Sequence, residues 1–228
     1  MEFTAIAALD LILRLSEKPI GTVIVHNFLM YPTIYVIRHG FTDANRDEIV
    51  AGGGFESHIL PEGLNQAREA GVFLRTLGIK KIFCSPMIRT RQTLEALQLP
   101  GIPVEFDARL REIDCGIHEG KPFNEMGERF ALSNLARTPD LQHPKGESAR
   151  MLCKRLRSFI DEKLTPNPSP VLLIMHGGSG TAFALELLKS AEILKECPHT
   201  RGLFGNSEVI KLENGHYERV FSPTLKSQ

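Results

Sequence analysis

The sequence YVIRHG occupies residues 35–40, and LLIMHGG occupies residues 172–178. In both segments an apolar run leads to a histidine that is followed by glycine. A β-strand that delivers a histidine and then breaks at glycine places the imidazole at the edge of a sheet, where a ligand can reach it. His39 and His176 lie 137 positions apart in the chain. The two segments therefore predict two strands that end at one shared pocket.

The composition of the chain favours a single enzyme-sized domain. Its 228 residues, of which 42% are hydrophobic, are enough to bury a full core, and this length fits one domain better than two. The 27 Lys and Arg residues equal the 27 Asp and Glu residues, so no overall field attracts nucleic acid or acidic membranes. We therefore expect a small-molecule ligand, held by a local cluster if it is anionic. The sequence makes no prediction of the oligomeric state.

The cysteines give no sign of a metal site or of a disulfide framework. The chain has four of them, widely spaced and without a C-x-x-C pair. We expect reduced thiols in a cytoplasmic protein, with no metal and no other cofactor. The four residues are Cys84, Cys115, Cys153 and Cys197.

The first thirty residues contain two apolar stretches, and neither predicts a signal peptide or a membrane span. Residues 5–15 include Asp10 and lead to no clear small-residue cleavage site. Residues 22–29 are interrupted by His26 and fall far short of the roughly 18 residues that a span requires. Met30 directly precedes the first clear strand. We expect residues 1–30 to be an appendage or an over-long start, and residues 31–228 to form the domain.

Apolar patterning and turn residues predict strands that alternate with helices. A mostly parallel α/β sheet with helices on both faces accounts for this alternation. Strands are expected at residues 33–37, 81–84, 104–106 and 171–175, and helices at residues 61–74, at 85–97, after 146–148 and at 181–188.

Two further segments complete the predicted fold. Residues 207–212 and 216–220 flank Asn214-Gly215, a dipeptide typical of a type I′ turn, and predict a closing β-hairpin. Residues 121–145 mix helix formers with prolines and many polar groups, and we expect them to form a short lid over the pocket.

Four motifs carry side chains that suit an anionic ligand. RHGFTDAN at residues 38–45 provides a guanidinium, an imidazole and neutral donors, although taken alone it fits an ordinary polar strand end equally well. SPMIRTRQT at residues 85–93 places Arg89 in the first turn of a helix, where an anion is favoured. LREIDCGIHEG at residues 110–120 supplies a carboxylate, and HGG at residues 176–178 supplies the second imidazole with glycine amides beside it.

With these motifs the chain resembles the histidine phosphatase superfamily, also called the phosphoglycerate mutase-like family. The family patterns are R-H-G-x-T-x-x-N, S-P-x-x-R-x-x-Q-T, L-x-E-x-x-x-G-x-x-E-G, G-E-S and H-G-G. All five occur here in that order, and GNSEV at residues 205–209 is similar to the family's last strand. The resemblance covers the chain from about residue 31 onward and implies a phosphoglycerate mutase-like fold.

The resemblance also implies a mechanism and its residues. His39 would be the nucleophile that forms a phosphohistidine, with its other ring nitrogen donating to a backbone carbonyl. Glu112 would protonate the leaving group and then activate water. The cluster would act without a metal, through charge and positioning. Arg38, Arg89 and His176 would surround the phosphoryl oxygens, and Gly40, Thr42, Asn45, Gly52 and Gly177 would complete the substrate site.

A phosphomonoesterase is the leading prediction, and a phosphoglycerate mutase is its nearest rival. Mutase-type relatives tend to have a longer lid with adjacent arginines and H-G-N after the second strand. Here Arg129 and Arg137 are apart, and Gly178 stands in place of that asparagine. A serine hydrolase would need a G-x-S-x-G elbow, and no serine lies in one. A protein that only binds phospholigands would be expected to lack His39 or Glu112.

Several neighbours of the motifs are expected to have structural roles. His118 is expected to face solvent, Cys115 to be a buried and inert thiol, and Arg91 to lie on a solvated helix face. Glu147 and Ser148 fit the start of a helix and a substrate contact equally well.

Overall fold

The computed structural model describes residues 31–130, 138–164, 169–188 and 202–224. The predicted appendage, residues 1–30, lies outside these ranges, as do Cys197 and Arg137. None of the helices in the described ranges has the combination of length and apolar character that a bilayer span requires.

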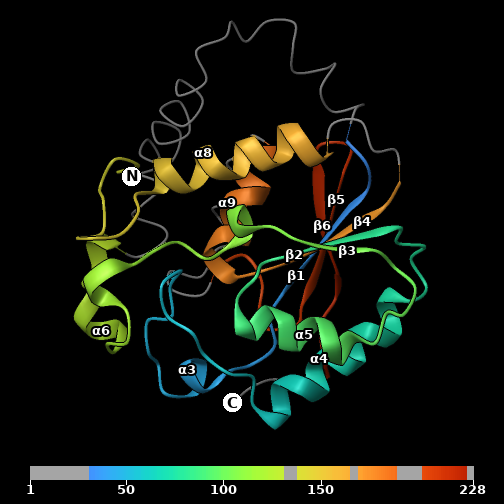
Figure 1. Ribbon diagram of the computed structural model, residues 1–228, viewed down its shortest axis with the longest axis horizontal. Helices are drawn as coiled ribbons and strands as arrows, with labels where there is room; N and C mark the ends of the chain where they lie inside the picture. The colour runs from blue at the N-terminus through green and yellow to red at the C-terminus, as the bar shows by residue number, and fades with distance from the viewer. Residues whose placement is uncertain (1–30, 131–137, 165–168, 189–201, 225–228) are drawn as a thin grey trace, which may run out of the picture.

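A six-stranded sheet of order β3-β2-β4-β1-β5-β6 forms the centre of the molecule (Figure 1). The four strands β3, β2, β4 and β1 run parallel, and β5 and β6 are antiparallel to their neighbours. The predicted mostly parallel sheet is therefore confirmed. The strands are β1 Ile34–Arg38, β2 Lys81–Cys84, β3 Val104–Phe106, β4 Val171–Met175, β5 Val209–Glu213 and β6 His216–Phe221.

Helices cover both faces of the sheet, as predicted, because successive side chains of the buried strands point to opposite sides. Val36 of β1 and Leu173 of β4 belong to the core cluster under α8 and α9. Ile37 and Ile174 belong to the cluster under α4 and α5. All four side chains are fully buried. The helices are α4 Pro61–Leu74, α5 Ile88–Leu97, α8 Ala149–Phe159 and α9 Gly177–Leu188 (Figure 1).

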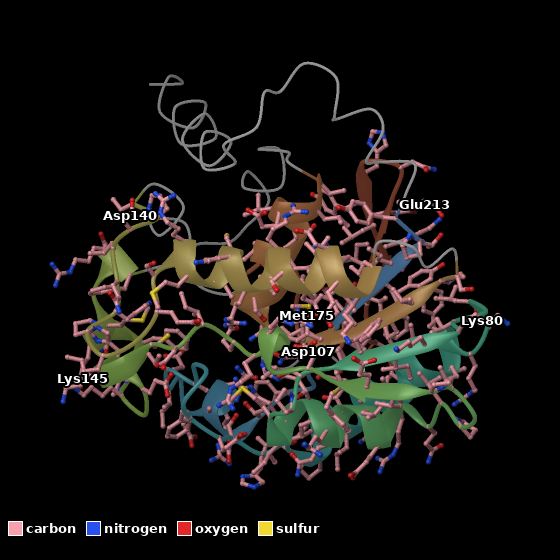
Figure 2. All side chains as sticks on the ribbon, turned by 45° about the horizontal axis from the view of Figure 1, so that its top comes forward. Lys80, Asp107, Asp140, Lys145, Met175 and Glu213 are labelled. Carbon is pink, nitrogen blue, oxygen red and sulfur yellow. The ribbon has the colours of Figure 1, made fainter. Side chains whose placement is uncertain are left out.

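The carboxyl ends of β1 and β4 lie side by side. Arg38 pairs with Met175 in the parallel register, and the His39 amide donates to the Met175 carbonyl over 3.0 Å. In Figure 2, Met175 lies inside the molecule, and Lys145 lies on the side opposite to Lys80, which precedes β2. The lid segment is therefore at the end of the sheet where the two histidines emerge.

The closing hairpin agrees with the prediction from its turn residues. β5 and β6 pair in an antiparallel register that closes at Glu213 and His216. Asn214 and Gly215 have φ values of 50° and 80°. A type I′ turn needs positive φ at both central positions, which Asn and Gly adopt more readily than other residues.

Helix α5 begins two residues later than the sequence predicts. The local pattern assigns the cap to Ser85 and the start of the helix to Pro86, whereas the first helical residue is Ile88 and Met87 occupies the N-cap position without a side-chain cap. The Ser85 hydroxyl is instead hydrogen-bonded to His176 Nε2 over 2.8 Å. The Ser85 hydroxyl, which the local sequence pattern assigns to the cap of the helix, therefore binds the histidine that follows β4. Arg89 still lies in the first turn of α5, as predicted.

The lid segment packs against the 116–118 turn through three rings. The His118 ring centroid lies 4.8 Å from that of Phe130 and 5.6 Å from that of His143. The prediction that His118 faces solvent is therefore wrong, because the 3-10 turn Gly116–His118 directs its ring toward the lid. His118 Nε2 and both ring nitrogens of His143 are buried without a hydrogen-bond partner within the described residues.

The buried His143 ring is expected to make the fold less stable in acid. Burial, with His118 nearby, lowers the pKa of His143 from 6.5 to about 4. Between pH 6.5 and about pH 4, His143 is therefore protonated in the unfolded chain and neutral in the folded protein. Stability from this group is present above pH 6.5 and is lost as the pH falls to about 4, by about 3 kcal/mol. Urea unfolding at several pH values measures this loss.

The matched variant for this prediction is His143→Phe, which keeps a ring against Phe130 and removes the titration. Burial also lowers the pKa of His39 and His176, so the wild-type slope contains their contributions. The difference between the wild type and His143→Phe isolates His143. Parallel pH profiles for the two proteins would contradict the prediction.

Candidate active site

His39 is held at the end of β1 with one ring nitrogen assigned. Its Nδ1 lies 2.8 Å from the Gly40 carbonyl oxygen. Because a carbonyl can only accept, Nδ1 carries the hydrogen and the lone pair is left on Nε2. Burial lowers the pKa of His39 well below its usual value, and Arg89 and Arg38 lower it further. At neutral pH the ring is therefore uncharged, with a free lone pair beside two cations.

His176 lies next to His39, as the two strand ends predicted. The ring centroids are 5.4 Å apart, and His176 is fully buried. Its Nδ1 accepts from Arg89 Nε over 3.0 Å, so Nε2 carries the hydrogen and donates to the Ser85 hydroxyl. Burial lowers the pKa of His176 well below its usual value, followed by the effect of Arg89. In this state His176 is neutral, and protein groups engage both of its nitrogens.

Arg89 is buried like a core residue, with 1% of its surface exposed. Besides His176, it donates to three carbonyl groups of the glycine-rich loop: Nη1 to Phe55 over 3.0 Å, and Nη2 to Ala51 and Gly52 over 3.2 Å each. The planar fork of a guanidinium suits such a set of acceptors. Arg89 therefore joins the 51–55 loop to the end of β4.

Gly52 takes part through its carbonyl and its lack of a side chain. A Cβ at this position would lie 2.7 Å from the Ile113 carbonyl oxygen. Only glycine lets the loop approach the segment that carries Glu112 so closely. The predicted site residue Gly52 is thus next to the cluster, where it accepts a hydrogen bond from Arg89.

The segment after His39 is shaped by local hydrogen bonds. The Gly40 amide donates to Thr93 Oγ1 over 3.1 Å. Thr42 is buried and serves as N-cap of the short helix α3, Asp43–Arg46, where its hydroxyl accepts from the Asn45 amide. In this structure the amide of Gly40 and the hydroxyl of Thr42 are therefore engaged by protein groups.

Asn45 is oriented by a second asparagine. Its Oδ1 accepts from the Thr42 amide over 3.2 Å and from Asn206 Nδ2 over 3.0 Å. Asn206 Nδ2 also donates to the His39 carbonyl over 3.0 Å. Backbone amides only donate and carbonyls only accept, so both side-chain orientations are determined. Asn45 Nδ2 is left as the donor that a ligand can use.

Glu112 is bound to the main chain at the first turn of α9. Its Oε2 accepts from the Gly178 amide over 2.8 Å, and its Oε1 accepts from the Ser179 amide over 2.7 Å and from its neighbour Ile113 over 2.9 Å. The carboxylate thus binds amides that come two and three residues after His176 in the chain. The structure therefore brings the predicted carboxylate to the same helix end as the second histidine.

This contact explains why α9 begins at Gly177 rather than at Thr181, the predicted start. The first amides of a helix have no partner within the helix, and a carboxylate there satisfies them and interacts favourably with the helix dipole. Glu112 does so for Gly178 and Ser179. The amide of Gly177, predicted to bind substrate, has no such contact with Glu112.

An ion pair holds the segment that carries Glu112. Arg155 Nε lies 2.9 Å from Glu147 Oε1, and Arg155 Nη2 donates to the Glu112 carbonyl over 2.9 Å. Glu147 Oε2 accepts from the Asp114 amide over 3.0 Å. Ser148 is the N-cap of α8, accepting from the Met151 amide, so the helix-start interpretation of this residue is confirmed.

Sequence reasoning missed four residues that organise the site. Each acts through another side chain or through backbone. Ser85 and Thr93 are fixed positions of the S-P-x-x-R-x-x-Q-T pattern, but the pattern does not say which partner they bind. GNSEV at residues 205–209 is the one signal for the asparagine, and by itself it indicates only the start of a strand. The four are Ser85, Thr93, Arg155 and Asn206.

Arg38 completes the positive side of the site. Its Nη1 lies 3.4 Å from the Phe204 carbonyl, and its charge lowers the pKa of His39. Arg38 and Arg89 therefore flank a neutral imidazole whose free lone pair is nucleophilic. A dianionic group would be attracted to these cations.

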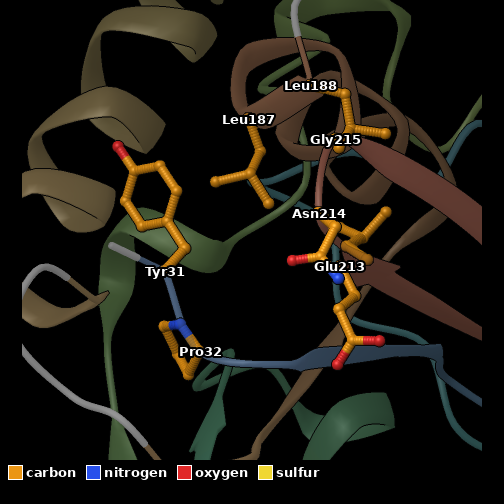
Figure 3. Close-up of a pocket in the computed structure, with 8 residues that line it drawn as sticks. Tyr31, Pro32, Leu187, Leu188, Glu213, Asn214 and Gly215 are labelled. Atoms are coloured by element: carbon orange, nitrogen blue, oxygen red, sulfur yellow. The ribbon is translucent and has the colours of Figure 1, made fainter. Parts of the chain in front are cut away.

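The hollow shown in Figure 3 is separate from this cluster. It is small and lies at the amino end of β1, opposite to His39. Its lining is formed by Tyr31, Pro32, Leu187, Leu188, Leu212, Glu213, Asn214 and Gly215.

Comparison with curated proteins finds relatives among phosphoryl-transfer enzymes. The protein named probable phosphoglycerate mutase GpmB of Citrobacter koseri is 36% identical over 149 residues, which are 63% of this chain and 69% of that protein. Fructose-2,6-bisphosphatase TIGAR of Bos taurus is 31% identical over 131 residues, covering 55% of this chain and 48% of that one.

Solved structures with the same fold cover most of the chain. Phosphoglycerate mutase from Thermus thermophilus matches with a TM-score of 0.60 at 25% identity, over 79% of this chain and 92% of that one. An Escherichia coli protein assigned as an alpha-ribazole-5′-P phosphatase matches with a TM-score of 0.64 at 20% identity, over 85% and 97% of the two chains. At 20% identity the match shows the fold alone.

A family model gives the assignment directly. It is the one described as histidine phosphatase superfamily (branch 1), and it matches residues 34–219. That range contains all of the strands from β1 to β5, the first four residues of β6, and every residue of the cluster around His39. The chain belongs to the histidine phosphatase superfamily.

Proposed function

We propose that the protein is a metal-independent phosphomonoesterase that forms a phosphohistidine on Nε2 of His39. The observation that carries the proposal is the hydrogen bond from His39 Nδ1 to the Gly40 carbonyl, which leaves the Nε2 lone pair beside two arginines. A neutral, oriented imidazole is the form of histidine that can attack phosphorus.

The reaction has two steps. In the first, His39 Nε2 bonds to phosphorus, the ester P–O bond breaks, and Glu112 gives its proton to the leaving oxygen. In the second, Glu112 takes a proton from water, the water oxygen bonds to phosphorus, and the P–N bond breaks to release phosphate. One carboxyl group serves both steps because its loss of a proton in the first makes it the base of the second.

Charge stabilisation comes from the protein's own side chains. Arg38 and Arg89 flank His39, and Asn45 Nδ2 is free to donate. Phosphoryl transfer depends mainly on positioning and on stabilising the charge of the equatorial oxygens. His176 is neutral before substrate binds, so we propose that it fixes Arg89 through the bond between Nδ1 and Nε.

Hydrolysis is proposed ahead of mutase activity, although curated relatives carry names from both classes. The lid is short, and Gly178 occupies the position where mutase-type relatives tend to have asparagine. Phosphoglycerate mutase activity is the second candidate, on the strength of the 36% identical relative.

A substrate panel without added metal tests the proposal. Purified protein, assayed in EDTA, is expected to release phosphate from p-nitrophenyl phosphate and from at least one sugar phosphate, phosphoglycerate or nucleotide. Interconversion of 2- and 3-phosphoglycerate that outpaces phosphate release would establish the mutase instead. Absence of hydrolysis for every monoester would overturn the proposed function and favour a protein that only binds phospholigands.

Replacing Glu112 by Gln is expected to lower kcat by about 100- to 10,000-fold, since proton transfer by a positioned group contributes about that much. The leaving group of p-nitrophenyl phosphate needs little protonation. With this substrate the substitution should therefore slow the second step, hydrolysis of the phosphohistidine, more than the first. Phosphohistidine should therefore accumulate in a rapid-quench experiment. Glu125→Gln, which removes an exposed lid carboxylate, is the control and should behave as wild type. Wild-type turnover by Glu112→Gln would refute the role.

A further inference from the structure

Glu119 joins the glycine-rich 51–55 loop to the segment that carries Glu112. Its Oε1 atom accepts from the Gly54 amide over 3.0 Å and from the Cys115 amide over 2.9 Å. One carboxylate oxygen therefore binds two stretches of main chain that are far apart in the sequence.

The loop that Glu119 binds is also the loop that binds Arg89. The guanidinium donates to the Phe55 carbonyl over 3.0 Å and to the Gly52 carbonyl over 3.2 Å. Gly54, which donates to Glu119, lies between these two residues in the chain. The carboxylate thus holds the stretch of main chain whose carbonyls orient the guanidinium.

Main-chain and side-chain contacts support neighbouring positions of this loop. The Gly53 amide donates to the Ile113 carbonyl over 2.7 Å. At the next residue, Gly54, the acceptor is the Glu119 side chain instead. Gly54 is exposed, so its amide can bond to water when this acceptor is withdrawn. A substitution at residue 119 should therefore shift the loop at Gly54 and leave it folded.

The charge of Glu119 has a small effect on Arg89. Burial lowers the pKa of Arg89, and three carboxylates oppose this effect, Glu112 the most, then Glu56, then Glu119. The Oε1 atom of Glu119, by contrast, binds two amides. A neutral carboxamide oxygen can accept the same two bonds. The contacts of Glu119 therefore depend on where its oxygen lies rather than on its charge.

We propose that Glu119 is a positioning residue for Arg89, and that it acts by accepting from Gly54 and so fixing the 51–55 loop. The proposal rests on the proposed function, in which Arg89 stabilises the phosphoryl oxygens. It adds a carboxylate that acts through the main chain without touching the substrate. Misplacement of a catalytic group by about 1 Å can cost about a hundredfold in rate, so a contact of this kind affects catalysis.

Two substitutions in the full-length protein separate the acceptor from the charge. Glu119→Gln keeps the oxygen at its distance and removes the charge, whereas Glu119→Asp keeps the charge and draws the oxygen back from Gly54. We expect Glu119→Gln to retain kcat/KM for p-nitrophenyl phosphate, and Glu119→Asp to lower it by about 10- to 100-fold. Wild-type kinetics for Glu119→Asp, or an equal loss in Glu119→Gln, would overturn the proposal.

Inhibition by vanadate provides a measurement that a loss of folded protein does not change. Vanadate mimics the transition state of phosphoryl transfer and uses the same contacts. Its inhibition constant should therefore rise in Glu119→Asp in proportion to the fall in kcat/KM. A purely structural role would lower the concentration of active sites and leave the inhibition constant unchanged, and that result would overturn the proposal. Thermal unfolding followed by circular dichroism shows whether each variant is folded.

The matched control is Glu69→Asp, which shortens another carboxylate that binds a distant amide. Glu69 is in α4, and its Oε2 accepts from the Thr224 amide over 2.8 Å. This variant should retain the wild-type kcat/KM and the wild-type inhibition constant. An equal loss in Glu69→Asp would show that such substitutions act through general stability, against the proposal.

A double-mutant cycle with Arg89→Ala tests the route through the loop. Without the guanidinium there is no donor for the loop to orient, so Glu119→Asp should cost much less in the Arg89→Ala background than in the wild type. Equal costs in both backgrounds would overturn the proposal. A wild-type enzyme that forms no phosphohistidine on His39 would instead overturn the proposed function. In that event the affinities of the wild type and Glu119→Asp for inorganic phosphate still test the positioning of Arg89.

Discussion

His39→Ala is expected to abolish turnover and the phosphoenzyme together. His39 is 5% exposed, its Nδ1 is bound to Gly40, and both nitrogens of the neighbouring His176 imidazole are engaged by protein groups. Removal of a nucleophile from a group of residues that act as a unit costs on the order of a million-fold in kcat. Steady-state phosphate release and acid-labile labelling of the protein with radioactive phosphate measure the two losses.

The control for this variant is His216→Ala, which removes an exposed imidazole from the start of β6. It should retain wild-type turnover and labelling. The expected residual rate of His39→Ala is about a millionth of the wild-type rate. Turnover by this variant at more than about a thousandth of the wild-type rate would therefore refute covalent catalysis by His39. Labelling of His39→Ala at another residue would likewise show that the nucleophile is not His39.

Arg89→Ala is expected to damage both activity and stability. Loss of one charged donor from such a site lowers kcat by about a hundred- to a thousandfold. The truncation also leaves the carbonyls of Ala51, Gly52 and Phe55 and the Nδ1 atom of His176 without their donor. Unsatisfied buried groups of this kind cost about 3 kcal/mol or more of unfolding free energy in total. Kinetics and urea unfolding measure the two effects.

Arg91→Ala is the matched control, because it removes a guanidinium two positions along the same helix. Arg91 is exposed, bonded to the Pro86 carbonyl over 2.8 Å, and its guanidinium lies 4.2 Å from the centroid of the Phe106 ring. Its loss should cost about 1 kcal/mol or less and leave kcat unchanged. Equal defects in the two variants would show that Arg89 acts only through general stability.

The arrangement of strands could be predicted because the signals for it are local. Apolar runs such as residues 171–175 end at a histidine and glycine, and the alternation of buried faces follows from strand geometry alone. The turn at Asn214-Gly215 is equally predictable, since its backbone angles restrict the residues that fit. The meeting of His39 and His176 follows from the parallel register of the strands before them.

The details of the cluster could not be predicted because they depend on contacts between distant segments. Nothing near Glu112 in the sequence indicates that its oxygens bind amides of α9, or that Asn206 orients Asn45. The sequence predicts His118 in solvent because a polar loop residue is usually exposed. It is half-buried because Phe130 and His143 of the lid lie against it. Local patterns carry no information about such partners.

The strand order has a consequence for the growing polypeptide. β1 ends at Arg38, next to His39. Its two neighbours in the sheet are β4 and β5, which begin at Val171 and Val209. More than a hundred residues are synthesised before either edge of β1 can be paired. At about 5–20 residues per second, this delay is on the order of ten seconds. During that time an apolar strand lacks the partners of both its edges, and unpaired apolar strands of this kind are prone to aggregate.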